Sequence, residues 1–338
     1  MKILITGGCG YIGSHTCVEL QNAGFDVLIA DNLSNSNQVV IDRIERITGK
    51  KPEFIQSDLS DNGQCSKVFE EFQGIEGVIN FAASKAVGES MEKPVMYYKN
   101  NLGIILNVIE NMQKHGIKYF VQSSSCTVYG EPEALPIKET SPVKDATSPY
   151  GHTKQIAEQM LAFITASTDI NAIALRYFNP IGAHASALIG ELPNGVPNNL
   201  VPFITQTAAG IRKELKVFGS DYPTPDGTCI RDYIHVVDLA KAHVVALKRM
   251  VEKKNKEKLE FFNIGTGHGY SVLEVINSFE KSTGVKLNWS FAPRRAGDII
   301  QIWADTSFAE RELGWKAQED INSMTLSAWQ WQQKLDKK

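Results

Sequence analysis

Hydrophobic positions in the first half of the chain alternate between short β-branched runs and longer stretches with apolar residues at helical spacing. The short runs predict six strands, at Lys2–Thr6, Asp26–Ala30, Glu53–Gln56, Gly77–Phe81, Lys118–Gln122 and Asn171–Arg176. The longer stretches predict four helices, at Ile12–Asn22, Val39–Ile47, Pro94–His115 and Tyr150–Ala166. Strands that alternate with helices of about 10–20 residues are typical of a parallel sheet covered on both faces. We therefore predict an α/β fold with a Rossmann-type, doubly wound parallel sheet.

The pattern changes after Phe178, where glycine, proline and asparagine become frequent. Further helices are predicted at Phe203–Ala209, Val237–Val251, Val272–Thr283 and near the C-terminus, and a strand at Leu215–Phe218. This half is less regular and predicts a smaller, mixed α/β domain that binds substrate. We expect a nucleotide-binding domain at residues 1–178, to which some later segments return, and a substrate domain at residues 179–338.

Composition narrows the class of protein. The chain has 338 residues, of which 43% are apolar and 22% charged, and its net charge is −3. These values suit about two globular domains and give no basic surface for nucleic acid or an anionic membrane. No apolar run approaches the ~20 residues of a membrane span, and the apolar start is too short for a signal peptide. Five widely spaced cysteines without a C-x-x-C predict neither disulfides nor a metal site, and favour the reducing cytoplasm.

A glycine-rich turn follows the first predicted strand, with Gly7, Gly10 and Gly13 spaced G-x-x-G-x-x-G. Between a strand and a helix, such glycines let the backbone approach a pyrophosphate at the helix N-terminus. A plain structural turn is the alternative. Asp31 ends the second strand, where a carboxylate accepts both ribose hydroxyls and repels a 2′-phosphate, which favours NAD over NADP. Asp58 either accepts from the adenine amino group or caps a helix.

A tyrosine and a lysine stand four residues apart in the stretch SPYGHTK. If Pro149 opens a helix, Tyr150 and Lys154 share one face of it. A free phenol has a pKa near 10, so lowering it by about three units requires roughly 4 kcal/mol, which nearby positive charge supplies. The fifth strand ends in Ser123, Ser124 and Ser125 at the carboxyl edge of the sheet, where such folds bind ligands, and one of them could hydrogen-bond a substrate hydroxyl; a capped strand end is the alternative. Alone, the Y-x-x-x-K spacing is weak; with the glycine turn it predicts an activated base.

Taken together, these motifs resemble a known family. TGGCGYIGSH, DNLSNS, KAVGES, SSSCTVYG, SPYGHTK, RYFNPIGAH, RDYIHVVDLA and WADTSFAERELGW are similar to segments of the extended short-chain dehydrogenases/reductases. The similarity runs along nearly the whole chain and is strongest to the UDP-hexose 4-epimerases within that family. It implies interconversion of UDP-glucose and UDP-galactose through a transient 4-keto sugar, with NAD tightly bound and regenerated in each turnover. It also implies a homodimer.

The resemblance implies a role for each site residue. Tyr150 would take the proton of the sugar 4-hydroxyl, Lys154 would bind the nicotinamide ribose and lower the tyrosine pKa, and Ser125 would assist proton transfer. The residues implied in NAD binding, beside the three glycines, are Tyr11, Ile12, Asp31, Asn32, Asp58, Leu59, Lys85, Asn100, Lys154 and Phe178. The residues implied in substrate binding, beside Ser125 and Tyr150, are Asn179, Asn199, Leu200, Phe218, Arg231, Arg295, Asp298 and Ile302.

Ile302 leaves undecided which UDP-sugar is the substrate. In the resembled family a large tyrosine at this position is associated with plain hexoses, and a small residue with tolerance of N-acetyl groups. Isoleucine is intermediate, so the UDP-N-acetylhexosamines (UDP-GlcNAc and UDP-GalNAc) remain alternative substrates, alone or beside the hexoses.

Other activities on this fold are less favoured. Cys126 and Thr127 stand before the VYG tripeptide where dehydrating relatives place acidic residues, so no carboxylate is offered for elimination. Asp31 disfavours an NADP reductase. A protein that binds NAD without catalysis is disfavoured because serine, tyrosine and lysine are all retained.

Overall fold

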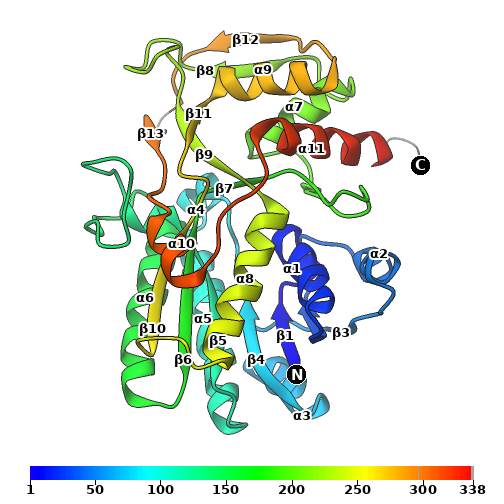
Figure 1. The fold of residues 1–338 in the computed structure, drawn as a ribbon, viewed down its shortest axis with the longest axis vertical. Helices are drawn as coiled ribbons and strands as arrows, with labels where there is room; N and C mark the ends of the chain where they lie inside the picture. Colours follow the sequence, from blue (N-terminus) through cyan, green and yellow to red (C-terminus); the bar gives the residue numbers. More distant parts are fainter. Residues whose placement is uncertain (296, 336–338) are drawn as a thin grey trace.

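The computed structural model describes residues 1–295 and 297–335. In this part of the chain, seven strands form one parallel sheet in the order β10-β6-β5-β4-β1-β2-β3 (Figure 1). Their bounds are β1 Lys2–Thr6, β2 Asp26–Asp31, β3 Glu53–Gln56, β4 Ile75–Asn80, β5 Tyr119–Ser125, β6 Asn171–Tyr177 and β10 Leu259–Ile264. The predicted doubly wound sheet is confirmed.

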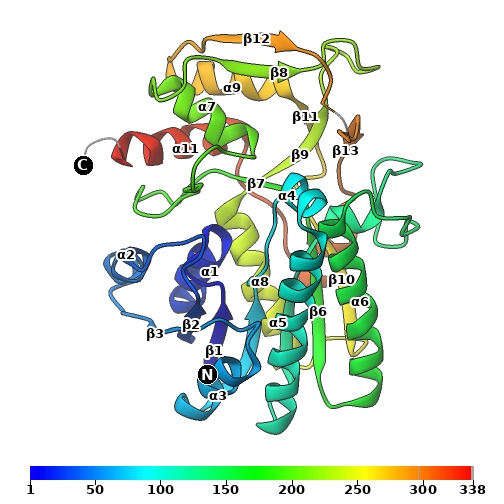
Figure 2. The ribbon, with the colours of Figure 1, turned by 180° about the vertical axis from the view of Figure 1, so that it is seen from behind.

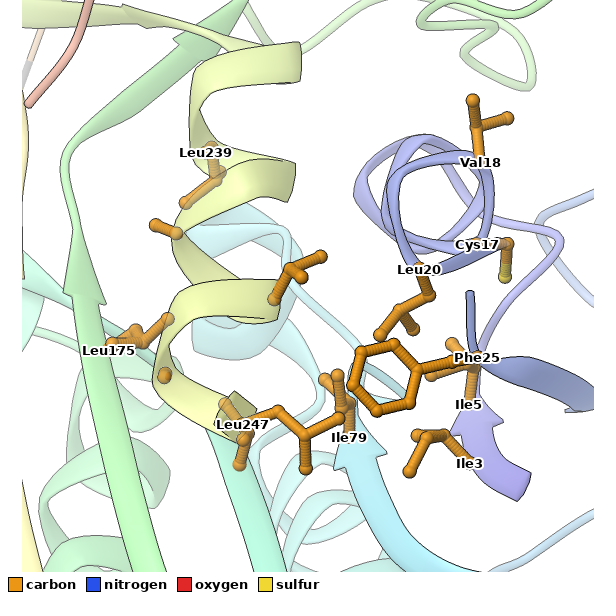
Figure 3. Packing of buried hydrophobic residues seen from close by; sticks show 14 of the residues in the cluster. Ile3, Ile5, Cys17, Val18, Leu20, Phe25, Ile79, Leu175, Leu239 and Leu247 are labelled. Carbon is orange, nitrogen blue, oxygen red and sulfur yellow. The ribbon is translucent and has the colours of Figure 1, made fainter. Parts of the chain in front are cut away.

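Helices cover both faces of the sheet, because alternate strand residues point to opposite sides. Ile3 and Ile5 pack in a core cluster with residues of α1 (Tyr11–Asn22), α2 (Val39–Thr48) and α8 (Val236–Val251). Figure 3 shows this face, with Leu20 and Leu247 of α1 and α8 directed toward the strands.

On the opposite face, Leu4 packs in a second cluster with residues of α3 (Asn62–Glu71), α5 (Pro94–Lys114) and α6 (Pro149–Ser167). Figure 2 shows α5 and α6 side by side on this face.

The chain returns to the sheet late. Both α8 and β10 lie beyond residue 178, yet α8 packs on the face that carries α1, and β10 pairs with β6 at the sheet edge. The sequence pattern predicts α8 but not β10. The strand LEFFNI directly follows the charged stretch VEKKNKEK, so its apolar run is too short to stand out.

A second, smaller assembly stands above the carboxyl ends of the main strands (Figure 1). In the described residues it contains a four-stranded mixed sheet and a parallel pair. The strands are β7 Asn179–Ile181, β9 Ile230–His235, β11 Gly269–Ser271 and β13 Gln301–Ile302, with the pair β8 Leu215–Phe218 and β12 Trp289–Ala292. The helices α7 Leu200–Ala208, α9 Val272–Thr283 and α11 Ile321–Leu335 share a separate core cluster there.

Three short helices complete the elements, α4 Val87–Glu92, the 3-10 turn η1 Cys126–Tyr129 and α10 Ser307–Leu313. None of the helices within residues 1–295 and 297–335 is long and apolar enough to cross a bilayer. The architecture places one edge of the main sheet next to the smaller assembly. The carboxyl ends of β1, β5 and β6 face the smaller assembly, so the edge at which open α/β sheets bind ligands lies beside it (Figure 2).

Candidate active site

The glycine turn after β1 forms a cradle that side chains would fill. Gly7 has a φ of +68°, and a Cβ added to it would stand 2.9 Å from the backbone nitrogen of Ala82. A Cβ on Gly13 would stand 2.4 Å from the carbonyl oxygen of Gly7. Gly10 precedes α1 without any side-chain cap, so the first amides of the helix face outward to an anion. This geometry fits the pyrophosphate of a dinucleotide such as NAD.

Asp31 is held at the end of β2 beside this turn and is 8% exposed. Its Oδ2 accepts from the backbone N–H of Cys9 at 3.0 Å, and its Oδ1 accepts from Leu33 N–H at 2.9 Å and Ser36 Oγ–H at 2.8 Å. The carboxylate therefore has a fixed orientation next to the turn, as a ribose acceptor requires. Asn32 follows it on the surface.

Asp58 does not cap a helix. The N-cap of α3 is Asp61, whose side chain accepts from the backbone N–H of Gln64 at 2.8 Å. Asp58 Oδ1 accepts instead from the backbone N–H and hydroxyl of Ser60 at 3.0 and 2.7 Å. The structure thus removes the helix-cap alternative for Asp58. Leu59 is 3% exposed and packs into the core cluster that contains Leu4.

Tyr150 and Lys154 lie one turn apart because α6 begins where the sequence predicts. Ser148 caps the helix by accepting from the Gly151 N–H at 3.2 Å, and Pro149 occupies its first turn. Lys154 Nζ donates to the carbonyl oxygen of Ser123 at 2.7 Å and lies 5.7 Å from the centre of the Tyr150 ring. Ser125, at the end of β5, lies close enough to the Tyr150 hydroxyl to lower its pKa. The structure brings the three predicted catalytic side chains together.

Burial shifts the two key pKa values in opposite directions. Desolvation raises the pKa of Tyr150 to about 12, and the nearby Ser125 only partly offsets this rise. Desolvation lowers the pKa of Lys154 to about 8, against the attraction of the Glu158 carboxylate. Bringing the phenol from a pKa of about 12 to neutral pH corresponds to about 7 kcal/mol. The sequence-based figure of roughly 4 kcal/mol started from a free phenol with a pKa near 10.

A buried ion pair fixes the back of α6, and the sequence analysis missed it. Arg176 donates from Nε and Nη2 to the two carboxylate oxygens of Glu158, at 2.9 and 2.7 Å. Ser124 Oγ–H donates to the same carboxylate at 2.6 Å. Glu158 stands four residues after Lys154, so the repeated spacing Y-x-x-x-K-x-x-x-E is a signal that was available. The pair ties α6 to β5 and β6 and thereby holds Lys154.

Tyr177 is a second residue that the sequence analysis missed. It lies close enough to Ser123, the residue that also accepts from Lys154, for that serine to lower the pKa of its phenol. Its hydroxyl lies 3.5 Å from Nε2 of His243 on α8. The neighbouring residues Phe178 and Asn179 were predicted, but no spacing in the sequence marks Tyr177 itself.

Ile302 lies in a cluster that joins the two parts of the molecule. Its side chain is 2% exposed and belongs to one apolar cluster with Cys126 and Phe178. Cys126 follows Ser125, and Phe178 precedes the start of β7, so Ile302 reaches the carboxyl edge of the main sheet. In register, Ile302 of β13 pairs with Arg231 of β9.

Three predicted substrate residues form a separate group on the smaller assembly. Phe218 ends β8 and is 43% exposed. The Arg295 guanidinium lies 5.8 Å from the centre of its ring and donates from Nη2 to Asp298 Oδ1 at 2.6 Å. An exposed aromatic face beside a guanidinium and a carboxylate suits a base, a phosphate and a ribose. Arg231, by contrast, donates from Nη1 to the carbonyl oxygen of Ile230 at 2.9 Å.

The remaining predicted residues lie on α1, α5 and α7 and in the connections beside them. Asn100 Nδ2–H donates to Asn101 Oδ1 at 3.0 Å on α5. Lys85 and Asn199 both contact the carboxylate of Glu191, which the sequence analysis did not single out. Leu200 begins α7 and packs partly against the core of the smaller assembly. Tyr11 and Ile12 open α1, and the Tyr11 hydroxyl donates to the carbonyl oxygen of Gly182 at 2.7 Å.

Comparison with known proteins agrees with this site. Residues 3–265 match the model of the NAD-dependent epimerase/dehydratase family. The chain belongs to this family. The predicted resemblance to extended short-chain dehydrogenases/reductases is thereby confirmed.

Relatives within the family cover the whole length. The UDP-glucose 4-epimerase of Bacillus subtilis (strain 168) is 51% identical over 333 residues, which are 98% of this chain and 97% of that protein. The crystal structure of UDP-glucose-4-epimerase from Stenotrophomonas maltophila, with bound NAD and formylated UDP-arabinopyranose, is 48% identical with a TM-score of 0.96 over 100% of this chain and 99% of that one. The crystal structure of UDP-glucose 4-epimerase from Bifidobacterium longum, in complex with NAD+ and UDP, is 48% identical with a TM-score of 0.93. The match covers 99% of this chain and 98% of that one.

Proposed function

We propose that this protein interconverts UDP-glucose and UDP-galactose by inverting C4 of the hexose, with NAD as a resident cofactor. The observation that carries the proposal is the grouping of Ser125, Tyr150 and Lys154 at the edge of the sheet that also holds the glycine cradle. Family members named UDP-glucose 4-epimerase at about half identity support it.

Each of the three side chains has a distinct task in this proposal. Bound NAD supplies the acceptor and donor of the C4 hydride, so no net oxidation occurs. Tyr150 accepts the proton of the 4-hydroxyl and returns it when the sugar is reduced on its other face. Lys154 stabilises the phenolate by its charge, and Ser125 orients the hydroxyl by a hydrogen bond to the same oxygen.

The two parts of the molecule divide the ligands. We assign NAD to the sheet built by residues 1–178 together with α8 and β10. We assign the UDP-sugar to the rest of residues 179–338, where Phe218 would stack on uracil, Asp298 would accept from the ribose hydroxyls and Arg295 would bind the diphosphate. Arg231 and Asn179 lie on neighbouring strands below them and would contact the diphosphate and sugar.

Plain hexoses are the favoured substrates because Ile302 has little freedom to move aside. Its side chain packs in a cluster with Val128 and Ile137, and its backbone is paired in β13. An N-acetyl group beside it would need that side chain to shift. Because isoleucine is smaller than tyrosine, the UDP-N-acetylhexosamines are retained as a second candidate class.

We also propose a homodimer and a cytoplasmic location. Val95, Leu106 and Phe163 on α5 and α6 are 65%, 52% and 80% exposed, an apolar surface that a second copy would cover. All five cysteines are unpaired, which suits a reducing compartment. Replacement of Phe163 by aspartate should yield monomers in analytical ultracentrifugation.

A direct experiment tests the activity. Purified protein is denatured and the released nucleotide is identified; native protein is then incubated with UDP-galactose and, separately, UDP-GalNAc, without added NAD. We expect NAD to be released and UDP-glucose to form. If neither substrate gives a 4-epimer the proposal fails, and product from UDP-GalNAc alone would move it to an N-acetylhexosamine epimerase. Tyr150→Phe should abolish turnover while UDP still binds.

A further inference from the structure

Glu191 stands between the two predicted ligand sites. It lies in the connection between β7 and α7, and its carboxylate is 12% exposed. Oε1 accepts from Nδ2–H of Asn199 at 2.7 Å and lies 3.6 Å from Nζ of Lys85. Asn199 belongs to the residues predicted to bind the UDP-sugar, and Lys85 to those predicted to bind NAD. One carboxylate therefore contacts one member of each set.

The backbone that carries Glu191 is fixed at several points. Its carbonyl oxygen accepts from Nε1–H of Trp331 on α11 at 2.9 Å. The preceding Gly190 lies so close to the same indole that a Cβ would stand 2.5 Å from it. Earlier in the connection, the carbonyl oxygen of Gly182 accepts from the Tyr11 hydroxyl. The carboxylate is thus presented from a rigid loop that is tied both to α11 and to the start of α1.

Such an anchored carboxylate organises the two flexible side chains beside it. Lys85 is 52% exposed, and Asn199 is also exposed, so neither is oriented by packing. A lysine side chain and an asparagine side chain each lose rotamer freedom when they bind a ligand, and this entropy opposes binding. Partners that hold them before the ligand arrives reduce that cost. The ion pair with Lys85 also neutralises a negative charge that would otherwise repel two diphosphates.

We propose that Glu191 is a positioning residue that holds Asn199 ready for the UDP-sugar and Lys85 ready for NAD. The inference rests on the proposed function, because it takes both ligands from there. Glu191 acts through its two partners and takes no part in proton or hydride transfer. Its loss should therefore change affinities and leave the chemical step almost intact.

Three variants separate the two contacts in the NAD-loaded protein. Glu191→Ala removes both, and should raise the Kd of UDP in calorimetry and the KM of UDP-galactose by about tenfold, with kcat within about twofold. Glu191→Gln keeps an amide oxygen for Asn199 and should keep the Kd of UDP within about threefold. Both should retain less NAD after gel filtration, since both lose the ion pair with Lys85. Glu110→Ala, which breaks an exposed ion pair on α5, is the matched control and should change nothing.

A double-mutant cycle tests the route of the effect. If Glu191 acts through Asn199, Asn199→Ala on the Glu191→Ala background should add almost no further loss of UDP affinity. Losses of UDP affinity that add fully in the double variant would overturn the proposal. Unchanged or tighter UDP binding in Glu191→Ala would also overturn it, since the carboxylate would then mainly repel the diphosphate. Interconversion of UDP-galactose by the unaltered protein is measured in parallel, so that failure of the inference is distinguished from failure of the proposed activity.

Discussion

Replacing Lys154 by methionine isolates the effect of its charge on Tyr150. The methionine side chain fills nearly the same volume, and the ammonium it removes lies 5.7 Å from the phenol ring. At an effective dielectric constant of about 20, two unit charges at that distance interact by about 3 kcal/mol. This interaction corresponds to about two units of tyrosine pKa. We therefore expect kcat at pH 7 to fall about a hundredfold.

The pH profile distinguishes charge tuning from simple loss of a ligand contact. Burial places the pKa of Lys154 at about 8, so above that pH the unaltered protein loses the same positive charge. The defect of Lys154→Met should therefore shrink as the pH rises from about 7 to about 10, because the unaltered protein then gives up the same charge. The assay is kcat for UDP-galactose, normalised to the NAD that each preparation retains.

The control is Lys114→Met, which removes an exposed lysine that pairs with Glu110 on α5. It should follow the unaltered profile at every pH. A loss in Lys154→Met that stays constant from low to high pH would refute the reasoning, because Lys154 would then act by binding or geometry and not by its charge.

Three further predictions follow from buried groups. Ile302→Ala should raise turnover of UDP-GalNAc relative to UDP-galactose, and an unchanged substrate ratio would contradict a role of Ile302 in selecting the sugar. Because the side chain is 2% exposed, the same substitution should lower the free energy of unfolding, measured in urea, by about 2–4 kcal/mol. Burial lowers the pKa of His15 to about 3 and that of His243 to about 4, so the unfolded chain binds more protons than the folded chain below about pH 6.5. Each histidine should therefore lower the free energy of unfolding by about 2 kcal/mol at pH 5 relative to pH 7. Urea titrations at the two pH values should show a smaller loss in His243→Gln. Arg176→Met should cost about 3–5 kcal/mol in the same assay because Glu158 is left buried without its cation, and Glu158→Gln added to it should restore part of the loss.

The sequence predicts the parts of this molecule that local pattern determines. β-branched runs place the strands around Ile3 and Ile29 in the sheet, and the glycines around Gly7 mark the cradle because only their missing Cβ allows the approach to Ala82. The sequence pattern does not predict strand β10, because a six-residue run beside a charged stretch is too short to show a hydrophobic period. It becomes a strand by pairing with β6, a contact about ninety residues away in the chain.

The sequence does not predict the supporting residues of the site, for a related reason. Arg176 and Glu158 are eighteen residues apart and look like ordinary charges of a strand and a helix, yet they form a buried bidentate pair. Glu191 resembles any acidic residue of a polar loop until the fold brings Lys85 and Asn199 to it from both sides. Side chains that touch a ligand carry recognisable motifs, whereas side chains that hold those motifs in place are defined by tertiary contacts.

Burial at the candidate active site opposes ionisation of the phenol that we propose as the base. The apolar surroundings that exclude water raise the pKa of Tyr150 to about 12 and lower that of Lys154 to about 8, so the protein alone keeps the phenol protonated at neutral pH. The ammonium accounts for about 3 kcal/mol of the roughly 7 kcal/mol needed. We propose that positive charge brought by an oxidised nicotinamide would supply the remainder. Proton removal from the sugar would then be tied to the state of the cofactor, and deprotonation would be suppressed when no hydride acceptor is in place.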